Sequence, residues 1–384
     1  MTSLLSDADA TLLASLCDEF NRFDPLTPVV TPWSDEMLNR FALPLFARQY
    51  HGNEALRGLC DRRHITPETL TSWEQIPAIP TDAFKYTRMS CASEQETVRT
   101  FLTSGTTQGA RGQHHFASLA PYKASLQKTF KRYALPDMER IRMIILAPST
   151  QDLPESSLSF MLSELVPALG TPDSRFLIKS KQGELKYDLE ALYEMLDQAE
   201  NTQQPVMILS TAFALMQLFD SAPERCWSLP EGSRLMETGG FKGRSREVSR
   251  QELYALFTRR LGIPSSHCIS EYSMTELSSQ AYSSHLYDQS VRGIVEVPTE
   301  AHYEVAPWVR LQVVDPISLQ PLIKANTVGL VRWFDLANTE SSMMIQTSDR
   351  GHIDDDGRLV LHGRAPDSEL RGCSLTIEEL MEDA

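Results

Sequence analysis

Phe101-Leu-Thr-Ser-Gly-Thr-Thr-Gln-Gly-Ala-Arg111 is an apolar run followed by a loop of small and hydroxyl-bearing residues that ends on a fixed positive charge. Glycines let the backbone approach a ligand closely, while backbone N–H groups, hydroxyls and a guanidinium all donate hydrogen bonds to phosphate oxygens. The loop lacks the Gly-Lys-Ser/Thr ending of a Walker loop. We interpret residues 101–111, which we call the clamp, as a polyphosphate site. The alternative is a plain surface loop, the commoner use of such residues, and partner segments elsewhere in the chain must decide between the two.

The composition narrows the class of protein. The chain has 384 residues, enough for a large core and about two domains. Its net charge of -15 disfavours a nucleic-acid backbone or an anionic membrane as partner, because neither attracts an acidic surface. Neither a signal-peptide pattern at Met1 nor a membrane span of ~20 apolar residues is found in the sequence. We expect a cytoplasmic protein with no nucleic-acid partner and no membrane span.

Apolar periodicity predicts an α/β fold. Helical spacing predominates in residues 1–100, and between 101 and 300 helices such as Pro121–Tyr133 alternate with apolar runs of strand length such as Ile141-Arg-Met-Ile-Ile-Leu-Ala147 and Pro205-Val-Met-Ile-Leu-Ser210. This alternation favours parallel strands, whose ligands bind at their carboxyl ends. From 301 to 366, short alternating runs between turn residues, such as Val309-Arg-Leu-Gln-Val-Val314 and Gly329-Leu-Val-Arg-Trp-Phe334, predict a β-rich subdomain. Residues 367–384 then form a hinge and a short tail.

Two shorter predictions concern the lead-in to the clamp. Thr66-Pro-Glu-Thr69 carries a helix-capping signature, and Ile76-Pro-Ala-Ile-Pro-Thr-Asp-Ala-Phe-Lys85 is punctuated by prolines, which predicts an extended segment. Lys85 is either a ligand-facing charge or, as we favour, a solvated lysine beside a loop.

The clamp resembles the nucleotide loop of the adenylate-forming superfamily, which includes acyl-CoA synthetases, nonribosomal-peptide adenylation domains and firefly luciferase. The shared part is Thr103-Ser-Gly-Thr-Thr107; where the family continues Gly-x-Pro-Lys, this chain has Gln108-Gly-Ala-Arg111, with arginine in place of lysine. The resemblance implies that the loop binds ATP and that Arg111 supplies catalytic charge. It assigns phosphate binding to Thr103, Ser104, Gly105, Thr106 and Thr107.

Leu235-Met-Glu-Thr-Gly-Gly-Phe-Lys-Gly-Arg244 is the second segment. Paired glycines followed by an aromatic residue would let an adenine ring lie against backbone and stack on the phenyl face; the alternative is a tight turn whose cations point to water. In the superfamily, a glycine-containing segment at this distance from the clamp borders the adenine. The resemblance assigns that role to Gly239, Gly240 and Phe241.

The third segment, Ile269-Ser-Glu-Tyr-Ser-Met-Thr-Glu276, resembles the superfamily's Tyr-Gly-x-Thr-Glu with serine in place of glycine. An aromatic ring covers the purine, a threonine hydroxyl reaches the α-phosphate, and a carboxylate holds the Mg²⁺ that neutralises the triphosphate. The resemblance implies these roles for Tyr272, Thr275 and Glu276. Without the clamp, the same segment reads as a strand end and a helix start.

The fourth signature has two parts. Thr347-Ser-Asp-Arg-Gly-His-Ile-Asp-Asp-Asp-Gly357 resembles the family's Thr-Gly-Asp, in which the carboxylate of Asp349 would accept hydrogen bonds from both ribose hydroxyls. Gly363-Arg-Ala-Pro-Asp367 resembles the Gly-Arg-x-x-Asp hinge, in which Arg364 contacts ribose or phosphate. Four ordered matches exceed what a single motif warrants.

The end of the chain points to one branch of the superfamily. Other members continue past the hinge for on the order of a hundred residues, a mobile domain that carries a catalytic lysine; residues 368–384 are too few for it. This ending, the Ile-Pro-x-Ile-Pro lead-in and Glu237-Thr-Gly-Gly-Phe-Lys-Gly243 together resemble the acyl-protein synthetases of bacterial luminescence operons. The fold implied is the large N-terminal adenylate-forming domain, with the lysine domain absent or vestigial.

The resemblance implies a covalent intermediate. That family transfers a fatty acyl group to one of its own cysteines near the C-terminus and from there to an acyl reductase, and Cys373 is the cysteine in the matching place. Arg371 and a cap at Thr376 would favour its thiolate. Without the family position, most free cysteines are small buried hydrophobes. We assign that core role to Cys17, Cys60, Cys226 and Cys268, and leave Cys91 undetermined.

The expected enzyme is an AMP-forming acid–thiol ligase that uses ATP and Mg²⁺ on a carboxylic acid, with an acyl-acceptor protein such as an acyl reductase as partner. Lys242, Arg244 or Arg111 would replace the missing lysine, and the sequence does not choose among them. Two alternatives stay open. One is an acyl- or aryl-CoA ligase of the phenylacetate-CoA ligase type, and the other is a non-catalytic nucleotide-binding or scaffold protein.

Overall fold

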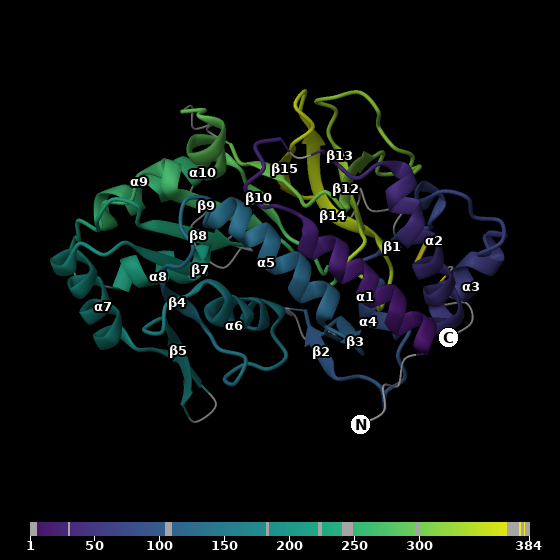
Figure 1. Cartoon of the computed structure of the whole chain (residues 1–384), viewed down its shortest axis with the longest axis horizontal. Coiled ribbons are helices and arrows are strands. Elements are labelled where there is room, and N and C mark those ends of the chain that lie inside the picture. The colour runs from purple at the N-terminus through teal and green to yellow at the C-terminus, as the bar shows by residue number, and fades with distance from the viewer. Residues whose placement is uncertain are drawn as a thin grey trace.

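The computed structural model describes residues 6–29, 31–103, 110–181, 184–221, 225–239, 249–295, 300–366, 376–377 and 380. Within them the chain forms a 13-stranded sheet flanked by helices and, apart from it, a two-stranded sheet (Figure 1). None of the described helices has both the length and the apolar character that crossing a bilayer requires.

The middle of the large sheet is a parallel block. The strands β9 (Cys268–Tyr272), β8 (Arg234–Thr238), β7 (Val206–Thr211), β4 (Arg142–Pro148) and β5 (Arg175–Lys181) lie next to one another in this order and run parallel. The α/β fold with parallel strands is therefore confirmed. At the edge, β6 (Glu184–Tyr187) pairs antiparallel with β5.

Alternate residues of these strands enter two separate cores, because successive side chains of a strand point to opposite faces. Met143 and Ile145 pack against one layer of helices, whereas Ile144 and Leu146 pack against another. The first layer comprises α5 (Ala120–Ala134) and α6 (Ser157–Leu169). The second comprises α7 (Leu189–Thr202), α8 (Ala212–Ser221) and α9 (Arg250–Leu261).

The same sheet continues into an antiparallel half. Beyond β9 the strand order is β10 (Ala281–Ser283), β11 (His302–Glu304), β15 (Leu359–Arg364), β14 (Met344–Ile353), β13 (Gly329–Asp335) and β12 (Val309–Val314). The predicted strands at Val309–Val314 and Gly329–Phe334 are confirmed as β12 and β13. Short helical turns flank β9 and β10. The turn η2 (Ser265–His267) precedes β9, and α10 (His285–Tyr287) and η3 (Asp288–Arg292) lie between β10 and β11.

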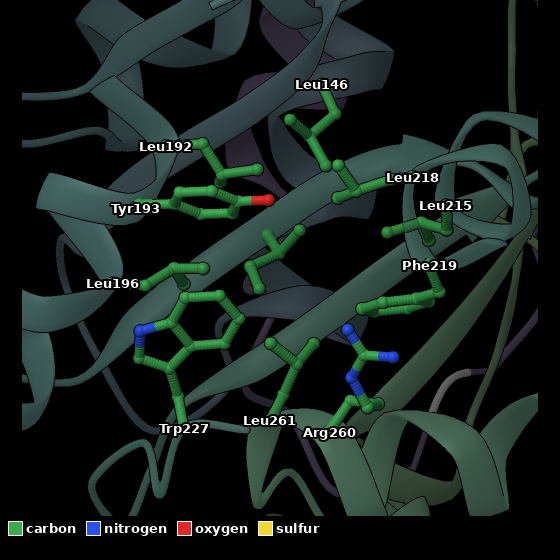
Figure 2. Close-up of a pocket in the computed structure, with 11 residues that line it drawn as sticks. Leu146, Leu192, Tyr193, Leu196, Leu215, Leu218, Phe219, Trp227, Arg260 and Leu261 are labelled. Atoms are coloured by element: carbon green, nitrogen blue, oxygen red, sulfur yellow. The ribbon is translucent and has the colours of Figure 1, made fainter. Parts of the chain in front are cut away.

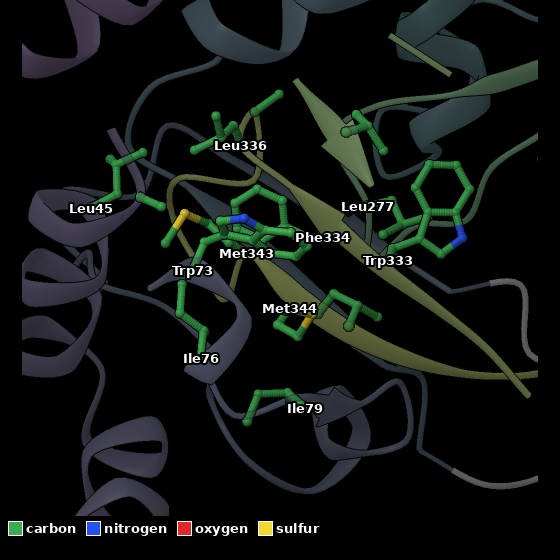
Figure 3. Close-up of a cluster of buried hydrophobic side chains, with 14 of the residues drawn as sticks. Leu45, Trp73, Ile76, Ile79, Leu277, Trp333, Phe334, Leu336, Met343 and Met344 are labelled. Carbon is green, nitrogen blue, oxygen red and sulfur yellow. The ribbon is translucent and has the colours of Figure 1, made fainter. Parts of the chain in front are cut away.

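The N-terminal region forms helices, as its apolar spacing predicts, and these helices pack on the antiparallel half of the sheet. They are α1 (Asp7–Arg22), α2 (Asp35–Gly52) and α3 (Glu54–Arg62), each with a polar side chain that caps its first turn. Their apolar faces share a core with β13 and β14, in which Leu45 of α2 lies near Phe334 and Met343 (Figure 3). This core holds the strands that carry Asp349 and Arg364.

The lead-in to the clamp differs from its prediction. Thr66–Thr69 forms a turn in which the Thr66 N–H donates to Oγ1 of Thr69 at 2.8 Å, so the capping signature there is wrong. A short helical turn, η1 (Trp73–Gln75), begins instead at the capping box of Ser72. The predicted extended segment contains β1 (Ile79–Pro80), which pairs parallel with β14, but it ends in the helical turn α4 (Ala83–Tyr86).

The clamp belongs to a hairpin of its own. Its first residues end β2 (Arg99–Leu102) and its last lead into β3 (Gln113–Phe116), and these two strands pair only with each other among the described strands. Phe101 and Phe116 are buried against α5 and α6. The hairpin is therefore packed on the large sheet through apolar side chains and not through its hydrogen-bond ladder.

Candidate active site

Tyr272, Asp349 and Arg364 come together where β9 ends beside β14 and β15. Asp349 and Arg364 are paired residues of neighbouring strands. The Tyr272 hydroxyl donates to Oδ2 of Asp349 at 2.7 Å, and Nε of Arg364 lies 3.4 Å from Oδ1. Burial, together with the Asp349 carboxylate, raises the pKa of Tyr272 well above its ordinary value, so the phenol stays protonated. Two residues predicted to bind nucleotide, Tyr272 and Arg364, thus both contact a third, Asp349.

Thr275 and Glu276 follow in a turn whose backbone is held from outside. The carbonyl oxygen of Thr275 lies 2.8 Å from Nδ1 of His114, and the carbonyl of Glu276 accepts a hydrogen bond from Nδ2 of Asn338 at 2.9 Å. Oγ1 of Thr275 lies 3.4 Å from Oγ of Ser157 at the start of α6. The turn therefore has one fixed path across the carboxyl end of β9.

The Glu276 carboxyl is buried, with 8% of the residue exposed. Burial raises its pKa to about 7, Asp82 adds to the rise, and the positive charges of Arg364 and Lys85 oppose it. Lys85 itself pairs with Asp82 at 2.5 Å on the exposed side of α4. Three charges from two segments, Asp82 and Lys85 at α4 and Arg364 at the end of β15, therefore act on Glu276; the sequence did not point to Asp82, and it favoured a solvated Lys85.

Thr103 of the clamp is bonded to Gly112, the residue that directly follows the clamp. Thr103 N donates to the carbonyl of Gly112 at 2.9 Å, and Gly112 N donates to Oγ1 of Thr103 at 2.9 Å. A Cβ on Gly112 would lie 2.9 Å from Cγ2 of Thr103, so this neck admits glycine alone without a shift. Ser104, Gly105, Thr106 and Thr107 lie outside the described residues.

Arg111 turns back towards the strand that precedes the clamp. Its Nε donates to the carbonyl of Thr103 at 2.7 Å, its Nη2 donates to the carbonyl of Leu102 at 3.3 Å, and its Nη1 lies 3.8 Å from Glu155. The guanidinium therefore holds the backbone of the clamp's neck. A role in phosphate charge stays a prediction.

Gly239 directly follows β8, next to Tyr272 across the sheet. Its φ of +71° is in the left-handed region, which glycine adopts without strain, and a Cβ there would meet nothing within 4 Å. The chain therefore leaves β8 through a turn at the predicted adenine segment. Gly240, Phe241 and Lys242 lie outside the described residues.

The cysteines divide into three groups. Cys60 and Cys268 are buried, as predicted, and burial raises the pKa of the Cys60 thiol to about 12. Cys17 and Cys91 are half-buried, with pKa values raised by burial to about 11 and about 12. Cys226 is exposed, so its assignment to the core is wrong. Cys373 lies outside the described residues.

An apolar pocket opens on the other helical layer. It is lined by residues of β4, β7, α7, α8 and α9, with Arg260 beside Phe219 and Leu261 (Figure 2). Its volume of about 10 Å³ holds roughly one water molecule. It lies among buried side chains of the second core and not beside Tyr272 or Glu276, so we assign no substrate to it.

Known proteins resemble this chain over different lengths. Residues 24–382 match the family model described as acyl-protein synthetase, LuxE. A long-chain-fatty-acid–luciferin-component ligase of Aliivibrio fischeri is 21% identical over 329 residues, which cover 83% of this chain and 79% of that protein. The protein of the same name from Photorhabdus luminescens is 26% identical over 113 residues, which cover 29% of this chain and 95% of that sequence.

Solved structures resemble the chain more distantly. ATP-bound MatB from Rhodopseudomonas palustris has a TM-score of 0.48 and 15% identity, covering 71% of this chain and 49% of that one. O-succinylbenzoate coenzyme A synthetase from Bacillus subtilis, in complex with AMP, has a TM-score of 0.45 and 18% identity, covering 70% and 49%. The chain spans about half the length of these two structures. The family assignment rests on the family model, whose match extends over most of the sequence: this chain belongs to the LuxE family of acyl-protein synthetases.

Proposed function

We propose that this chain uses ATP to activate a carboxylic acid, a long-chain fatty acid by analogy with its relatives, and passes the acyl group through its own thiol to an acceptor protein. One observation carries the proposal: Tyr272, Asp349, Arg364 and Glu276 converge at the carboxyl end of β9 in a chain of the acyl-protein synthetase family. Ligands of α/β sheets bind at this edge.

The nucleotide would lie across the ends of β8 and β9. Asp349, already oriented by Tyr272 and Arg364, has the acceptor oxygens that two ribose hydroxyls need. The turn at Gly239 would border the adenine. The clamp, with Ser104, Gly105, Thr106 and Thr107, would receive the phosphates, and Gly240 and Phe241 would complete the adenine side.

Glu276 fits a magnesium ion bound with the substrate. Mg²⁺ usually binds one or two carboxylates and completes its shell with water and phosphate oxygens. Glu276 is a buried carboxyl with Asp82 nearby, and among the described residues no three metal-binding side chains form a site without a substrate. Glu276 would therefore hold the ion only together with ATP, and the ion would neutralise the charge of the phosphates.

In the first step an oxygen of the acid's carboxylate attacks the α-phosphorus of ATP. The bond from that phosphorus to the bridging oxygen breaks, pyrophosphate leaves, and the acyl group is joined to AMP as a mixed anhydride. The Thr275 hydroxyl and the clamp donors would stabilise the negative charge that develops on the phosphate oxygens, so the chain contributes positioning and electrostatic stabilisation. Lys242, Arg244 and Arg111 are the candidate cations.

In the second step the thiolate of Cys373 attacks the activated carbonyl carbon. A thioester forms, the carbonyl–phosphate bond breaks and AMP leaves; a thiol or other nucleophile of the acceptor protein, such as an acyl reductase, then takes the acyl group. Burial raises the pKa of Cys17, Cys60, Cys91 and Cys268, which disfavours the thiolate in each of them, so the exposed Cys226 is the described cysteine that the experiment must compare with Cys373.

Intact-mass analysis after incubation with ATP, Mg²⁺ and a series of fatty acids tests the proposal. We expect the mass of the protein to rise by one acyl group without added coenzyme A, and Cys373→Ala to abolish this rise while pyrophosphate release continues for a first turnover. The matched control is Cys226→Ala, which removes an exposed thiol and should leave acylation intact. Acyl-coenzyme A as the sole acylated product would indicate a ligase of the phenylacetate type, and no pyrophosphate with any acid would indicate a binding protein.

A further inference from the structure

A line of polar side chains crosses three strands beside the proposed nucleotide site. Glu271 of β9 is the register partner of Thr238 in β8 on one side and of Tyr282 in β10 on the other, so the three side chains point to the same face of the sheet. That face carries α5 and α6. The residues that follow Thr238 and Glu271 in sequence are Gly239 and Tyr272, so the line adjoins the place where the acid would meet ATP.

Two polar atoms of this line are buried without a hydrogen-bond partner among the described residues. The Thr238 hydroxyl donates to Oε2 of Glu271, but Oε1 of Glu271 and the hydroxyl of Tyr282 are unpaired. The exposed fractions of Glu271 and Tyr282 are 2% and 0%. Buried polar groups are nearly always paired, because leaving one unpaired is strongly unfavourable.

Aromatic rings surround the line. Burial raises the pKa of Tyr122 in α5 and the nearby Glu271 charge adds to the rise, while Glu271 and Tyr122 both add to the rise that burial causes in the pKa of Tyr282. Its ring lies 5.5 Å from that of Phe160 and 6.3 Å from that of Phe101, centroid to centroid. A ligand here would place carbon atoms against aromatic faces and a polar group against Glu271 and Tyr282.

The unpaired atoms define the polar group. A carboxylate oxygen accepts a hydrogen bond and a phenol donates one, so a single hydroxyl satisfies both: it donates to Oε1 of Glu271 and accepts from Tyr282. A second carboxylate would be repelled wherever Glu271 is ionised, and an ammonium group would leave the phenol hydrogen without an acceptor. A plain aliphatic chain would leave both atoms unpaired.

We propose that Glu271 and Tyr282 form a specificity site that binds a hydroxyl group carried near the carboxyl end of the acid substrate. The inference rests on the proposed function, since it names the class of acid that the same site activates: a hydroxy acid. A site built to pair with a substrate hydroxyl discriminates strongly against the analogue that lacks it.

The test compares kcat/KM for pyrophosphate release with α-hydroxy, β-hydroxy and unsubstituted fatty acids of equal chain length. We expect one hydroxy acid to exceed the plain acid by about tenfold or more, the ratio that ~1.4 kcal/mol of hydrogen bonding produces. Tyr282→Phe and Glu271→Leu should each bring this ratio close to one. Tyr282→Phe keeps the ring, so it supplies the answer even where Glu271→Leu does not fold.

The matched control is Tyr303→Phe. Tyr303 is also buried, but its hydroxyl lies 2.8 Å from Oγ of Ser270 on the opposite face of the sheet, so the ratio should stay at its wild-type value. A wild-type ratio near one, or a preference for the plain acid, overturns the inference and leaves the proposed function standing, because pyrophosphate is still released. Absence of pyrophosphate with every acid overturns both.

Discussion

Nδ1 of His114 lies 2.8 Å from the backbone carbonyl oxygen of Thr275, so the strand that leaves the clamp is tied to the turn that carries Glu276. Nε2 of the same ring lies 3.1 Å from Oγ of Ser341. Burial lowers the pKa of His114 to about 4, so the ring is neutral at physiological pH. Because a carbonyl only accepts, Nδ1 is the donor, and the single hydrogen of the Ser341 hydroxyl is shared between Nε2 and Oδ1 of Asn338, which lies 2.9 Å from Oγ.

We predict that His114→Phe lowers the free energy of unfolding by about 1–3 kcal/mol, because the carbonyl of Thr275 and the hydroxyl of Ser341 then lose a buried partner. The same variant should raise the KM for ATP, because Thr275 is no longer fixed against the clamp. His114→Asn, whose amide can reproduce the donor at Nδ1, should restore the KM more than the stability. Denaturant unfolding and initial rates of pyrophosphate release measure the two effects.

The neighbouring His115 provides the control. It lies on the same strand, and its Nδ1 lies 2.9 Å from Oγ1 of Thr100 in the hairpin. His115→Asn should alter stability without changing the KM for ATP. An unchanged KM in His114→Phe would contradict a positioning role and leave His114 as a structural residue alone.

A second prediction concerns pH. Burial raises the pKa of Glu276 to about 7 from an ordinary 4.5. Below pH 4.5 Glu276 is protonated in both states and has no effect; as the pH rises towards 7 the unfolded chain loses the proton first, so the folded state loses about 3 kcal/mol of relative stability. Glu276→Gln should remove this loss and become more stable than wild type at neutral pH. The activity of the wild type should rise through pH 7 while its stability falls, because the ionised carboxylate of Glu276 binds the metal.

Glu271→Gln separates this effect from a general one, since burial also raises the pKa of Glu271 to about 7. Both variants should flatten the pH dependence of stability. In wild type the Mg²⁺ concentration needed for activity should depend on pH, and in Glu276→Gln alone this dependence should disappear. If it also disappeared in Glu271→Gln, the metal role of Glu276 would be refuted.

Tyr272→Phe is the third prediction. The variant keeps the ring that would cover the purine but removes the hydrogen bond to Asp349, which is worth about 1 kcal/mol. We expect the KM for ATP to rise roughly fivefold with little change in kcat. The control is Tyr133→Phe, which removes the phenol that donates to Glu304 and that has no proposed contact with the nucleotide; its kinetics should equal those of the wild type. An equal effect of both variants would mean that Tyr272 acts through stability and not through the nucleotide.

The fourth prediction distinguishes two roles of Arg111. Its guanidinium bonds two backbone carbonyls, those of Thr103 and Leu102, and a single lysine ammonium cannot reproduce that fork. Arg111→Lys should therefore raise the KM for ATP nearly as much as Arg111→Ala. Full activity in Arg111→Lys would show that the charge matters and the backbone bonds do not.

Much of the fold was predictable because the spacing of apolar residues along the sequence indicates which side chains are buried in a helix or strand. The strands at Ile141–Ala147 and Pro205–Ser210 and the helix at Pro121–Tyr133 lie where apolar spacing placed them, as β4, β7 and α5. Local signals did not predict structure that depends on contacts with distant segments. The strand β1 has two residues and is formed by pairing with β14. Thr66–Thr69 has a capping pattern, but no helix begins there.

Site residues that belong to a sequence motif could be predicted, whereas site residues that only the folded chain brings to the site could not. Tyr272, Asp349 and Arg364 were predicted together and are in contact. His114 was missed, because a histidine in a four-residue strand carries no signal until the hairpin is folded against Thr275. Cys226 was assigned to the core from residue type alone, but it is exposed in the connection between α8 and β8.

The isolation of β2 and β3 from the large sheet has a consequence for dynamics. A two-stranded ribbon is barely stable alone, so the clamp's hairpin depends on Phe101, Phe116 and His114 for its order. Amide protons of β2 and β3 should exchange with deuterium through small openings, while those of β8 and β9 wait for unfolding of the entire sheet. Opening of β2 and β3, which flank the segment proposed to bind the phosphates, should therefore cost less free energy than opening of β8 and β9, and it would let pyrophosphate leave without unfolding the large sheet.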